Sequence, residues 1–339
     1  MALTLRSILR QRVRSDIYAL TVLPDLGGEV LPLNQLGPDV PSSHLVYHSS
    51  FGEPEITSLL DDRKQPISMI FHNLTPHHYF ENHSARFATG LLWGEYELDR
   101  LRGKWKHVIA DSEFNAKYLR NRGYQHVSVA PLGVRVDRLH DLQGDYRLER
   151  DLAQRFPNGY FVVIAQQLPH KRIELAISTL SLLRHTFRHD IGLVIVGAER
   201  IRSYSAALRT FAERLRVENH LLFTGSVNDD SLSSILRTSR CLLLTSDHEG
   251  LGIPPLEAMS LLVPVIARHV GAVAETLRNG ALILPSYSGP CAFAAAIHRL
   301  LKSKPLQELL VATGLSRLDE FKNEDRSLEV ADLLLGRAS

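Results

Sequence analysis

The stretch SDHEGLGIPPLEAM, residues 246–259, carries residue types that could bind an anion where a strand-like run meets a helix. Its two glycines allow a sharp turn, and its two prolines suit a first helical turn, where a missing amide hydrogen matters little. The amides of Gly252 and Ile253 would then point out of the helix toward an anion. Glu249 and Glu257 could accept hydrogen bonds from hydroxyl groups of the same ligand. The pattern equally fits a tight connection in which Glu257 favours the helix dipole.

Lys171, in the stretch QQLPHKR, is the cation that such a site would need, because two carboxylates repel a nearby phosphate. It follows the apolar run Phe161–Ala165 and is therefore expected near the carboxyl end of a strand. A single lysine at such a place is usually only a solvated helix start. The second anion-binding element in the same half of the chain favours a functional role for Lys171.

His72 ends a second strand-like run, in the stretch IFHNLTPHHYF. A histidine at the carboxyl end of a strand could hydrogen-bond a sugar or a phosphate. His77, His78 and His83 follow closely, and a metal site is the alternative use for this cluster. No carboxylate or cysteine completes a recognisable ligand spacing there, so we predict no metal site.

The elements that must position these residues alternate along the whole chain, with short apolar runs followed by helical patterns. Such alternation predicts parallel sheets covered by helices on both faces, and ligands bind such sheets at the carboxyl ends of the strands. The predicted strands are Asp16–Leu23, Leu45–His48, Ile67–Asn73, His107–Ser112, Val127–Leu132, Phe161–Ala165, Leu193–Gly197, Leu221–Gly225, Leu242–Ser246, Pro264–Arg268 and Leu282–Pro285.

The length of 339 residues predicts two domains. The stretch Leu139–Asn158 is polar and ends in the turn-like PNGY, so we expect the linker within it. The prediction is an N-terminal domain, a linker, a C-terminal domain facing the first across a cleft, and a final helix that packs back on the first domain. The corresponding ranges are 1–145, 146–158, 159–322 and 323–339.

The composition excludes some classes of protein. Lys and Arg number 39 and Asp and Glu 37, and this balance argues against a nucleic-acid binder. The hydrophobic share of 44% and the charged share of 22% are typical of a soluble globular protein. Cys241 and Cys291 lie in apolar contexts, which predicts buried free thiols in a reducing, cytoplasmic setting. No apolar run approaches the roughly 18 residues of a membrane span.

Residues 1–14 place Leu5, Ile8, Leu9 and Val13 on one helical face and arginines on another. We expect an ordinary helix packed on a sheet. The alternative is a basic amphipathic surface that contacts anionic lipid, which would bring the protein to the inner face of the membrane.

Taken together, these stretches resemble the retaining glycosyltransferases of family four, which have the GT-B fold of two Rossmann-like domains facing a cleft. Glu249 and Glu257 are similar to that family's E-x7-E signature, and PVIARHVGAVAET resembles its continuation. The stretches KR (171–172), VGA (196–198) and FTGSV (223–227) occur in the family's order. YHSSFGEP, FHNLTPHHYF and ADSEFNAKYL resemble a bacterial branch that glycosylates cell-envelope or exopolysaccharide carriers.

The resemblance implies a metal-independent, cofactor-free hexosyltransferase that uses a GDP- or UDP-linked sugar and a glycan or lipid-linked acceptor. Catalytic roles are implied for Glu249 and His72, which would contact the transferred sugar, and for Lys171, which would neutralise the donor diphosphate. Glu257 would bind the ribose hydroxyls. Donor-binding residues implied by the resemblance are Glu257, Gly250, Leu251, Gly252, Ile253, Gln166, Gly197, Gly225, Ser226 and Val227.

The sequence departs from the family pattern in three ways. The change at Gln166 and the missing first strand support a second hypothesis, whereas Leu262 is expected to be only a packing change. Ala165 and Gln166 stand where the family usually has Gly-Arg, and Leu262 stands where a glycine is usual. Because the chain starts where the family's first helix would lie, we expect the first strand and its small-residue loop to be missing; a misassigned start is the alternative. The second hypothesis is therefore a catalytically impaired nucleotide-sugar-binding or scaffold protein of the same fold. A nucleotide-sugar epimerase is a weaker third hypothesis, because those enzymes lack the HEGLG…EAM arrangement.

Overall fold

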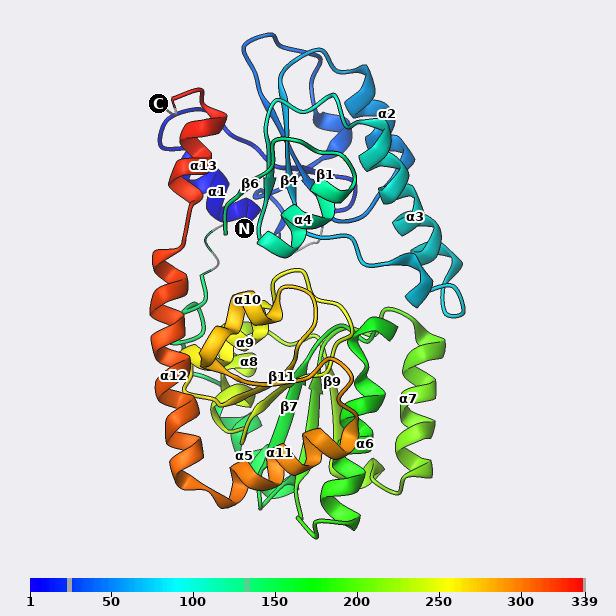
Figure 1. The fold of residues 1–339 in the computed structure, drawn as a ribbon, viewed down its shortest axis with the longest axis vertical. Helices are drawn as coiled ribbons and strands as arrows, with labels where there is room; N and C mark the ends of the chain where they lie inside the picture. The colour runs from blue at the N-terminus through cyan, green and yellow to red at the C-terminus, as the bar shows by residue number, and fades with distance from the viewer. Residues whose placement is uncertain (23–25, 132, 134, 338–339) are drawn as a thin grey trace. The chain divides into compact units, whose positions relative to one another are not determined.

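The computed structural model of the protein describes residues 1–22, 26–131, 133 and 135–337. The chain divides into two compact units, drawn in Figure 1, and each is described here by itself. Unit 1 comprises residues 1–76, 89–134 and 322–339, and unit 2 comprises residues 77–88 and 135–321. Each unit contains its own parallel sheet.

Unit 1 has a four-stranded parallel sheet in the order β3-β4-β5-β6 and a separate parallel pair, β1-β2. The elements of unit 1 are α1 (Ala2–Leu9), β1 (Tyr18–Ala19), β2 (Leu31–Pro32), β3 (Leu45–Ser49), α2 (Pro54–Asp62), β4 (Ile67–Phe71), α3 (Ala85–Arg100), β5 (Val108–Ala110), α4 (Glu113–Asn121), β6 (Ser128–Val129) and α13 (Ser327–Leu334). The first turn of α3 is counted with unit 2.

The N-terminal helix α1 packs as an ordinary helix on the sheet of unit 1. Leu5 and Leu9 are buried in one cluster with Ile70 of β4, Ile109 of β5 and side chains of α13. Figure 1 shows α1 and α13 side by side. The apolar face of α1 is thus used for packing inside the unit, as the first of the two interpretations of this helix expects.

Unit 2 has a six-stranded parallel sheet in the order β12-β11-β10-β7-β8-β9. The order reverses between β7 and β10, which is the doubly wound Rossmann arrangement. Its elements are α5 (Tyr146–Arg155), β7 (Tyr160–Ile164), α6 (Ile173–His185), β8 (Gly192–Val196), α7 (Arg202–Arg214), β9 (Leu221–Gly225), α8 (Asp229–Arg237), β10 (Leu242–Leu244), α9 (Ile253–Ser260), β11 (Val265–Arg268), α10 (Val273–Leu277), β12 (Leu282–Leu284), α11 (Pro290–Lys302) and most of α12 (Lys304–Asn323).

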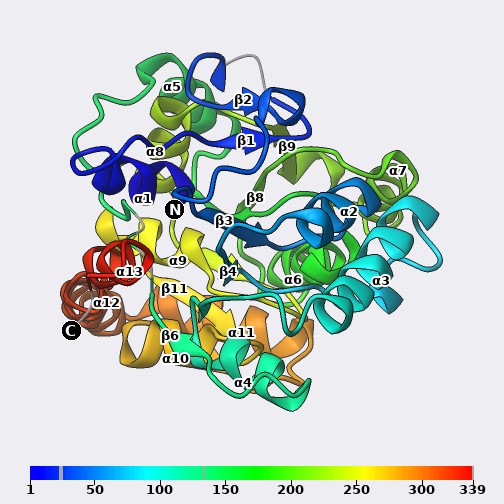
Figure 2. The same cartoon turned by 90° about the horizontal axis from the view of Figure 1, so that it is seen from above.

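The helices of unit 2 form two groups around its sheet. α6 contacts both α7 and α11, whereas α5 contacts α8. Figure 2, turned by 90° from Figure 1, shows α9 beside β11. The strands between the two groups are covered throughout: every residue of β8, β10 and β11 is buried. This explains why β8 and β10 are apolar throughout rather than alternating in polarity, and why β11 is apolar up to Arg268 at its end.

Most predicted strands occur at or near their expected positions, and the prediction of parallel α/β units is confirmed. The predicted strand Asp16–Leu23 is reduced to β1, and Leu23 lies outside the described residues. Val127–Leu132 is reduced to β6, and Leu132 also lies outside them. The short strand β2 had no sequence signal, because it ends at a proline that cannot donate to a ladder.

The structure corrects the prediction of a linker at 146–158. These residues belong to unit 2 and contain α5. The carboxylate of Asp145 caps this helix by accepting from the Leu148 amide at 3.0 Å. Leu148, Leu152 and Phe156 recur every four residues along a charged helix, and the last two are buried. That spacing was the helix signal, but the many charged residues around it suggested a loop.

Two further expectations concern the thiols and the membrane. Cys241 is buried as expected, whereas the prediction for Cys291 is wrong because its side chain is exposed in the first turn of α11. In the part of the chain that the structure describes, no helix is both long and apolar enough to cross a membrane.

A close backbone approach in unit 1 generates a prediction about stability. The loop before α2 lies against α3, and the amide of Gly52 donates to the carbonyl of Gly90 at 3.2 Å. A Cβ at position 52 would lie 2.2 Å from the backbone nitrogen of Gly94. We therefore expect Gly52→Ala to destabilise the protein by about 1–3 kcal/mol, because backbone atoms must move apart. Thermal denaturation followed by circular dichroism measures the loss.

Gly103→Ala is the matched control, since a Cβ there would meet nothing within 4 Å. Its unfolding midpoint should stay near that of the wild type. Equal midpoints for the two variants would contradict the packing explanation.

Candidate functional site

The predicted site residues of unit 2 gather at the carboxyl edge of its sheet, around the reversal of strand order. Lys171 lies in the short turn η4 (Pro169–Lys171) that follows β7, and Glu249 lies in the loop that follows β10. β7 and β10 are neighbours in the sheet. The sequence pattern thus placed both residues correctly at strand ends, and the reversal of strand order makes these ends adjacent.

Lys171 and Glu249 form an ion pair across this reversal. The Nζ atom of Lys171 donates to Oε1 of Glu249 at 2.7 Å, and Oγ of Ser246 donates to the same oxygen at 2.5 Å. The side chains of Lys171 and Glu249 are only 19% and 11% exposed, so the contact is largely removed from solvent. Largely desolvated charges of opposite sign stabilise each other, so neither group can leave this pair without new charged or hydrogen-bonding partners.

The Gly250–Ile253 segment leads directly into α9. Gly252 precedes this helix with φ of 87°, a left-handed conformation that favours glycine, and Pro254 lies in the first turn. Gly271, from the loop after β11, packs tightly here, since a Cβ on it would lie 2.0 Å from the carbonyl oxygen of Glu249. The next residue, Ala272, donates its amide to that oxygen at 3.0 Å. The backbone that presents Glu249 is therefore fixed from the neighbouring strand end.

The carboxylate of Glu257 is buried in α9 and is engaged by an arginine that sequence reasoning missed. Nε of Arg138 donates to Oε1 of Glu257 at 2.9 Å, and the same guanidinium pairs with Asp229. Burial raises the pKa of Glu257, and the charge of Arg138 opposes that rise. Arg138 lies in an irregular segment 119 residues away, and no periodicity or spacing marked it.

The remaining predicted donor-binding residues lie along the same sheet edge. Gln166 is exposed directly after β7, Gly197 follows β8, and Gly225 ends β9 with Ser226 and Val227 after it. A Cβ on Gly197 would lie 2.0 Å from the carbonyl oxygen of Ala165, so the ends of β7 and β8 approach closely there. Leu251 is buried beside the start of α9. Their donor contacts stay predictions.

His72 lies in unit 1, at the end of β4 as predicted. Its Nδ1 is 3.1 Å from Oδ2 of Asp111, and its Nε2 is 2.7 Å from Nδ1 of His48. Asn115 donates to the other oxygen of Asp111 at 2.6 Å. Burial and the neighbouring His72 lower the pKa of His48 to about 3. His48 and Asp111, which the sequence did not single out, orient the His72 ring, and its predicted contact with a sugar stays a prediction.

The segment after His72 that contains His77, His78 and His83 is part of unit 2 and packs against it through aromatic rings. The rings of Tyr79 and Phe80 lie 6.2 and 5.6 Å from that of His170, next to Lys171. His83 packs edge-on against Tyr204 at 5.5 Å. Across the described residues, no three His, Cys, Asp or Glu side chains are grouped as metal ligands would be.

The Arg138–Glu257 contact generates a pH-dependent prediction. When a carboxyl has a higher pKa in the folded protein than in the unfolded one, the protein loses folding stability as the pH rises through the folded-state pKa. Arg138→Ala should raise the pKa of Glu257 further, leaving a buried carboxylate uncompensated when ionised. We expect this variant to lose about 1–3 kcal/mol of stability at neutral pH and less at a lower pH, because protonation removes the uncompensated charge of Glu257. Thermal denaturation at the two pH values measures the difference.

Glu257→Gln supplies the matched background for this measurement. Adding Arg138→Ala to it should cost the same at both pH values, because the titrating group is gone. An equal loss at both pH values in the single Arg138→Ala variant would contradict an action on the Glu257 charge.

Comparison with known proteins identifies the family. The model of the family described as glycosyl transferases group 1 matches residues 150–334, more than half of the chain. An uncharacterised glycosyltransferase of Methanocaldococcus jannaschii is 31% identical over 127 residues, which are 37% of this chain and 31% of that protein. The O-antigen chain mannosyltransferase B of Escherichia coli is 28% identical over 168 residues, 49% of this chain and 43% of that protein. The chain thus spans less than half the length of either relative.

Solved structures share the fold along most of the chain. A glycosyltransferase from Rickettsia africae has a TM-score of 0.70 at 15% identity, with coverage of 98% of this chain and 94% of that one. The Anabaena protein HepE, solved in complex with UDP and glucose, has a TM-score of 0.65 at 17% identity, with coverage of 80% and 72%. These similarities confirm the predicted GT-B fold class of two Rossmann-like domains. With the family match to residues 150–334, they support one conclusion: the chain belongs to the glycosyl transferases group 1 family.

Proposed function

We propose that this protein transfers a hexose from a GDP- or UDP-linked sugar to a hydroxyl group of a glycan or lipid-linked acceptor. The observation that carries the proposal is the Lys171–Glu249 pair at the strand reversal of unit 2, beside the start of α9. A cation and a helix N-terminus supply the positive charge that a diphosphate requires, and the carboxylate can accept from sugar hydroxyls. Mannose is the first sugar to test, because similar proteins are named for mannosyl transfer.

In the proposed reaction, the bond between the sugar's anomeric carbon and the phosphate oxygen breaks. A bond from the acceptor oxygen to that carbon forms on the same face, which retains the configuration, and the acceptor proton passes to the departing phosphate. Lys171 would exchange Glu249 for the diphosphate and stabilise its developing charge, the largest contribution in this kind of catalysis. Glu249, released from Lys171, would accept from the hydroxyls of the transferred sugar.

The proposal also states where the reaction takes place and that it needs no metal ion. Relatives named for O-antigen chains support a role in polysaccharide or cell-envelope synthesis, with the reaction at the cytoplasmic face of the membrane where nucleotide sugars are available. Transfer should continue in the presence of a chelator, because Lys171 would do the work that a divalent cation does in other transferases. Loss of activity on chelation would contradict this part of the proposal.

The second hypothesis, an impaired sugar-nucleotide-binding or scaffold protein, is favoured by one observation. Gln166 is exposed two residues after β7. Members of the family usually have an arginine at this position, so one positive charge is missing here. Binding of nucleotide sugars without transfer or hydrolysis, across a panel of acceptors, would support this alternative instead.

Two substitutions test the main proposal. Lys171→Ala and Glu257→Ala should each lower the rate of sugar transfer by about 100-fold or more while the protein stays folded. A thermal-shift screen of nucleotide sugars identifies the donor first, since a ligand of the native state raises the unfolding midpoint. Radiolabelled transfer from that donor then measures each rate.

Lys304→Ala is the matched control, because this lysine lies on α12 with its side chain 84% exposed. Its transfer rate should equal that of the wild type. Rates near wild type in either test variant would show that these charges do not serve the reaction.

A further inference from the structure

The turn that carries Lys171 is held in place by the loop after β10. Asp247 donates its amide to the carbonyl of His170 at 2.8 Å, and Oγ1 of Thr245 donates to the carbonyl of Lys171 at 2.9 Å. Nη1 of Arg172 donates to Oδ2 of Asp247 at 2.8 Å. Three consecutive residues of the turn are therefore bound from one loop, and that loop also presents Glu249.

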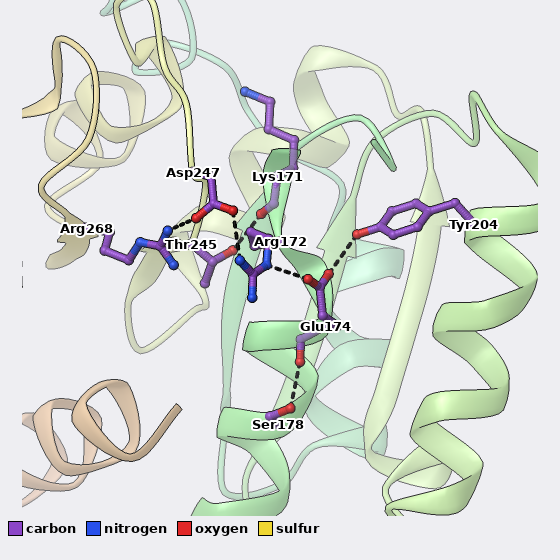
Figure 3. Close-up of polar contacts among 8 residues, drawn as sticks. All are labelled: Lys171, Arg172, Glu174, Ser178, Tyr204, Thr245, Asp247 and Arg268. Carbon is purple, nitrogen blue, oxygen red and sulfur yellow. Dashed lines mark hydrogen bonds and ion pairs between the residues drawn. The ribbon is translucent and has the colours of Figure 1, made fainter. Parts of the chain in front are cut away.

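Asp247 stands between two guanidinium groups in this arrangement, as Figure 3 shows. One belongs to Arg172, and the other belongs to Arg268 at the end of β11, which is 7% exposed. Two cations this close repel each other unless an anion lies between them. Asp247 is that anion, and Arg268 in turn fixes the direction of its carboxylate.

The other side of Arg172 is also engaged. Its Nε donates to Oε1 of Glu174 at 2.5 Å, and the hydroxyl of Tyr204 donates to Oε2 of Glu174 at 2.8 Å. A chain of alternating charge thus runs from Glu174 of α6 through Arg172 and Asp247 to Arg268 of β11, and Tyr204 of α7 binds its first carboxylate (Figure 3). Arg172 has φ of 50° and ψ of 46°, a strained conformation for a residue with a side chain. Its guanidinium is bound by carboxylates on both sides while its backbone adopts that conformation.

The Lys171 side chain itself is directed away from this chain of charges (Figure 3). Its Nζ pairs with Glu249, so the network acts on Lys171 through the backbone and not through its ammonium group. The direction in which Lys171 projects depends on the peptide units at His170 and Lys171, which the Thr245–Asp247 segment binds.

We propose that Asp247, which is held by Arg268, is a positioning residue. It orients the Lys171 turn so that Nζ of Lys171 reaches the diphosphate of the donor. The inference rests on the proposed function, since it assigns Lys171 to a nucleoside diphosphate. Asp247 needs no contact with the ligand. It sets the orientation of Lys171, and any loss on its removal should appear only when Lys171 is present.

The test measures binding of GDP and UDP to the full-length protein by titration calorimetry, and therefore does not depend on the acceptor. Lys171→Ala should weaken binding of the preferred nucleotide by about 10- to 100-fold, and Asp247→Asn by about tenfold. In the Lys171→Ala background, Asp247→Asn should cause no further loss, because two changes that act through one group are not additive. Asp190→Asn, an exposed aspartate that pairs with Arg184, is the matched control and should bind like the wild type.

A rescue variant separates positioning from stability. Asp247→Asn leaves Arg268 buried without its anion and should lower the unfolding midpoint. Adding Arg268→Met removes that unpaired charge and should restore the midpoint while nucleotide binding stays about tenfold weak. Recovery of binding together with the midpoint would overturn the positioning role and leave Asp247 purely structural.

The outcomes also separate the inference from the function on which it rests. Wild-type protein that binds neither GDP nor UDP would overturn the proposed function and the inference with it. Binding that Lys171→Ala weakens and Asp247→Asn leaves unchanged would overturn the inference alone. A loss from Asp247→Asn of equal size with and without Lys171 would also overturn it.

Discussion

The ion pair between Lys171 and Glu249 is the interaction around which the rest of unit 2 is arranged. Its members lie 78 residues apart and meet only because the strand order reverses between β7 and β10. A largely desolvated pair tolerates little misalignment, since each charge then lacks its counterion. The surrounding loops accordingly hold it through the backbone: Gly271 fits against Glu249, and Thr245 and Asp247 bind the Lys171 turn.

Each unit orients its predicted site residues by contacts of its own, and the two sets of contacts are alike. Near Lys171, opposite charges alternate from Glu174 through Arg172 and Asp247 to Arg268, so that no charge lies without a neighbour of the other sign. In unit 1, His72 is similarly oriented by Asp111 and His48, without a full ion chain. In both units, polar side chains stand where strands end, and their orientation is set by residues of the adjacent strand end.

Strand positions and the residues that follow them were predictable from sequence, because an apolar run that ends at glycine or a polar residue is a local signal. Lys171, Glu249 and His72 were found in this way. The roles of Arg138, Asp247 and Arg268 were not predictable, because they come from side-chain partners on other elements that no local pattern identifies. The helix α5 was mistaken for a linker because its charged residues outweighed a short apolar repeat.

The guanidinium of Arg138 gives Glu257 an internal competitor. That hydrogen bond reaches only Oε1, so the second carboxylate oxygen can still accept from another donor. A ligand that takes Oε1 displaces Arg138, which keeps Asp229 as its partner, and the measured affinity is then the difference between two interactions. Arg138 lies in the irregular segment that begins the main stretch of unit 2, so a ligand of that kind would remove one of the contacts that hold this segment.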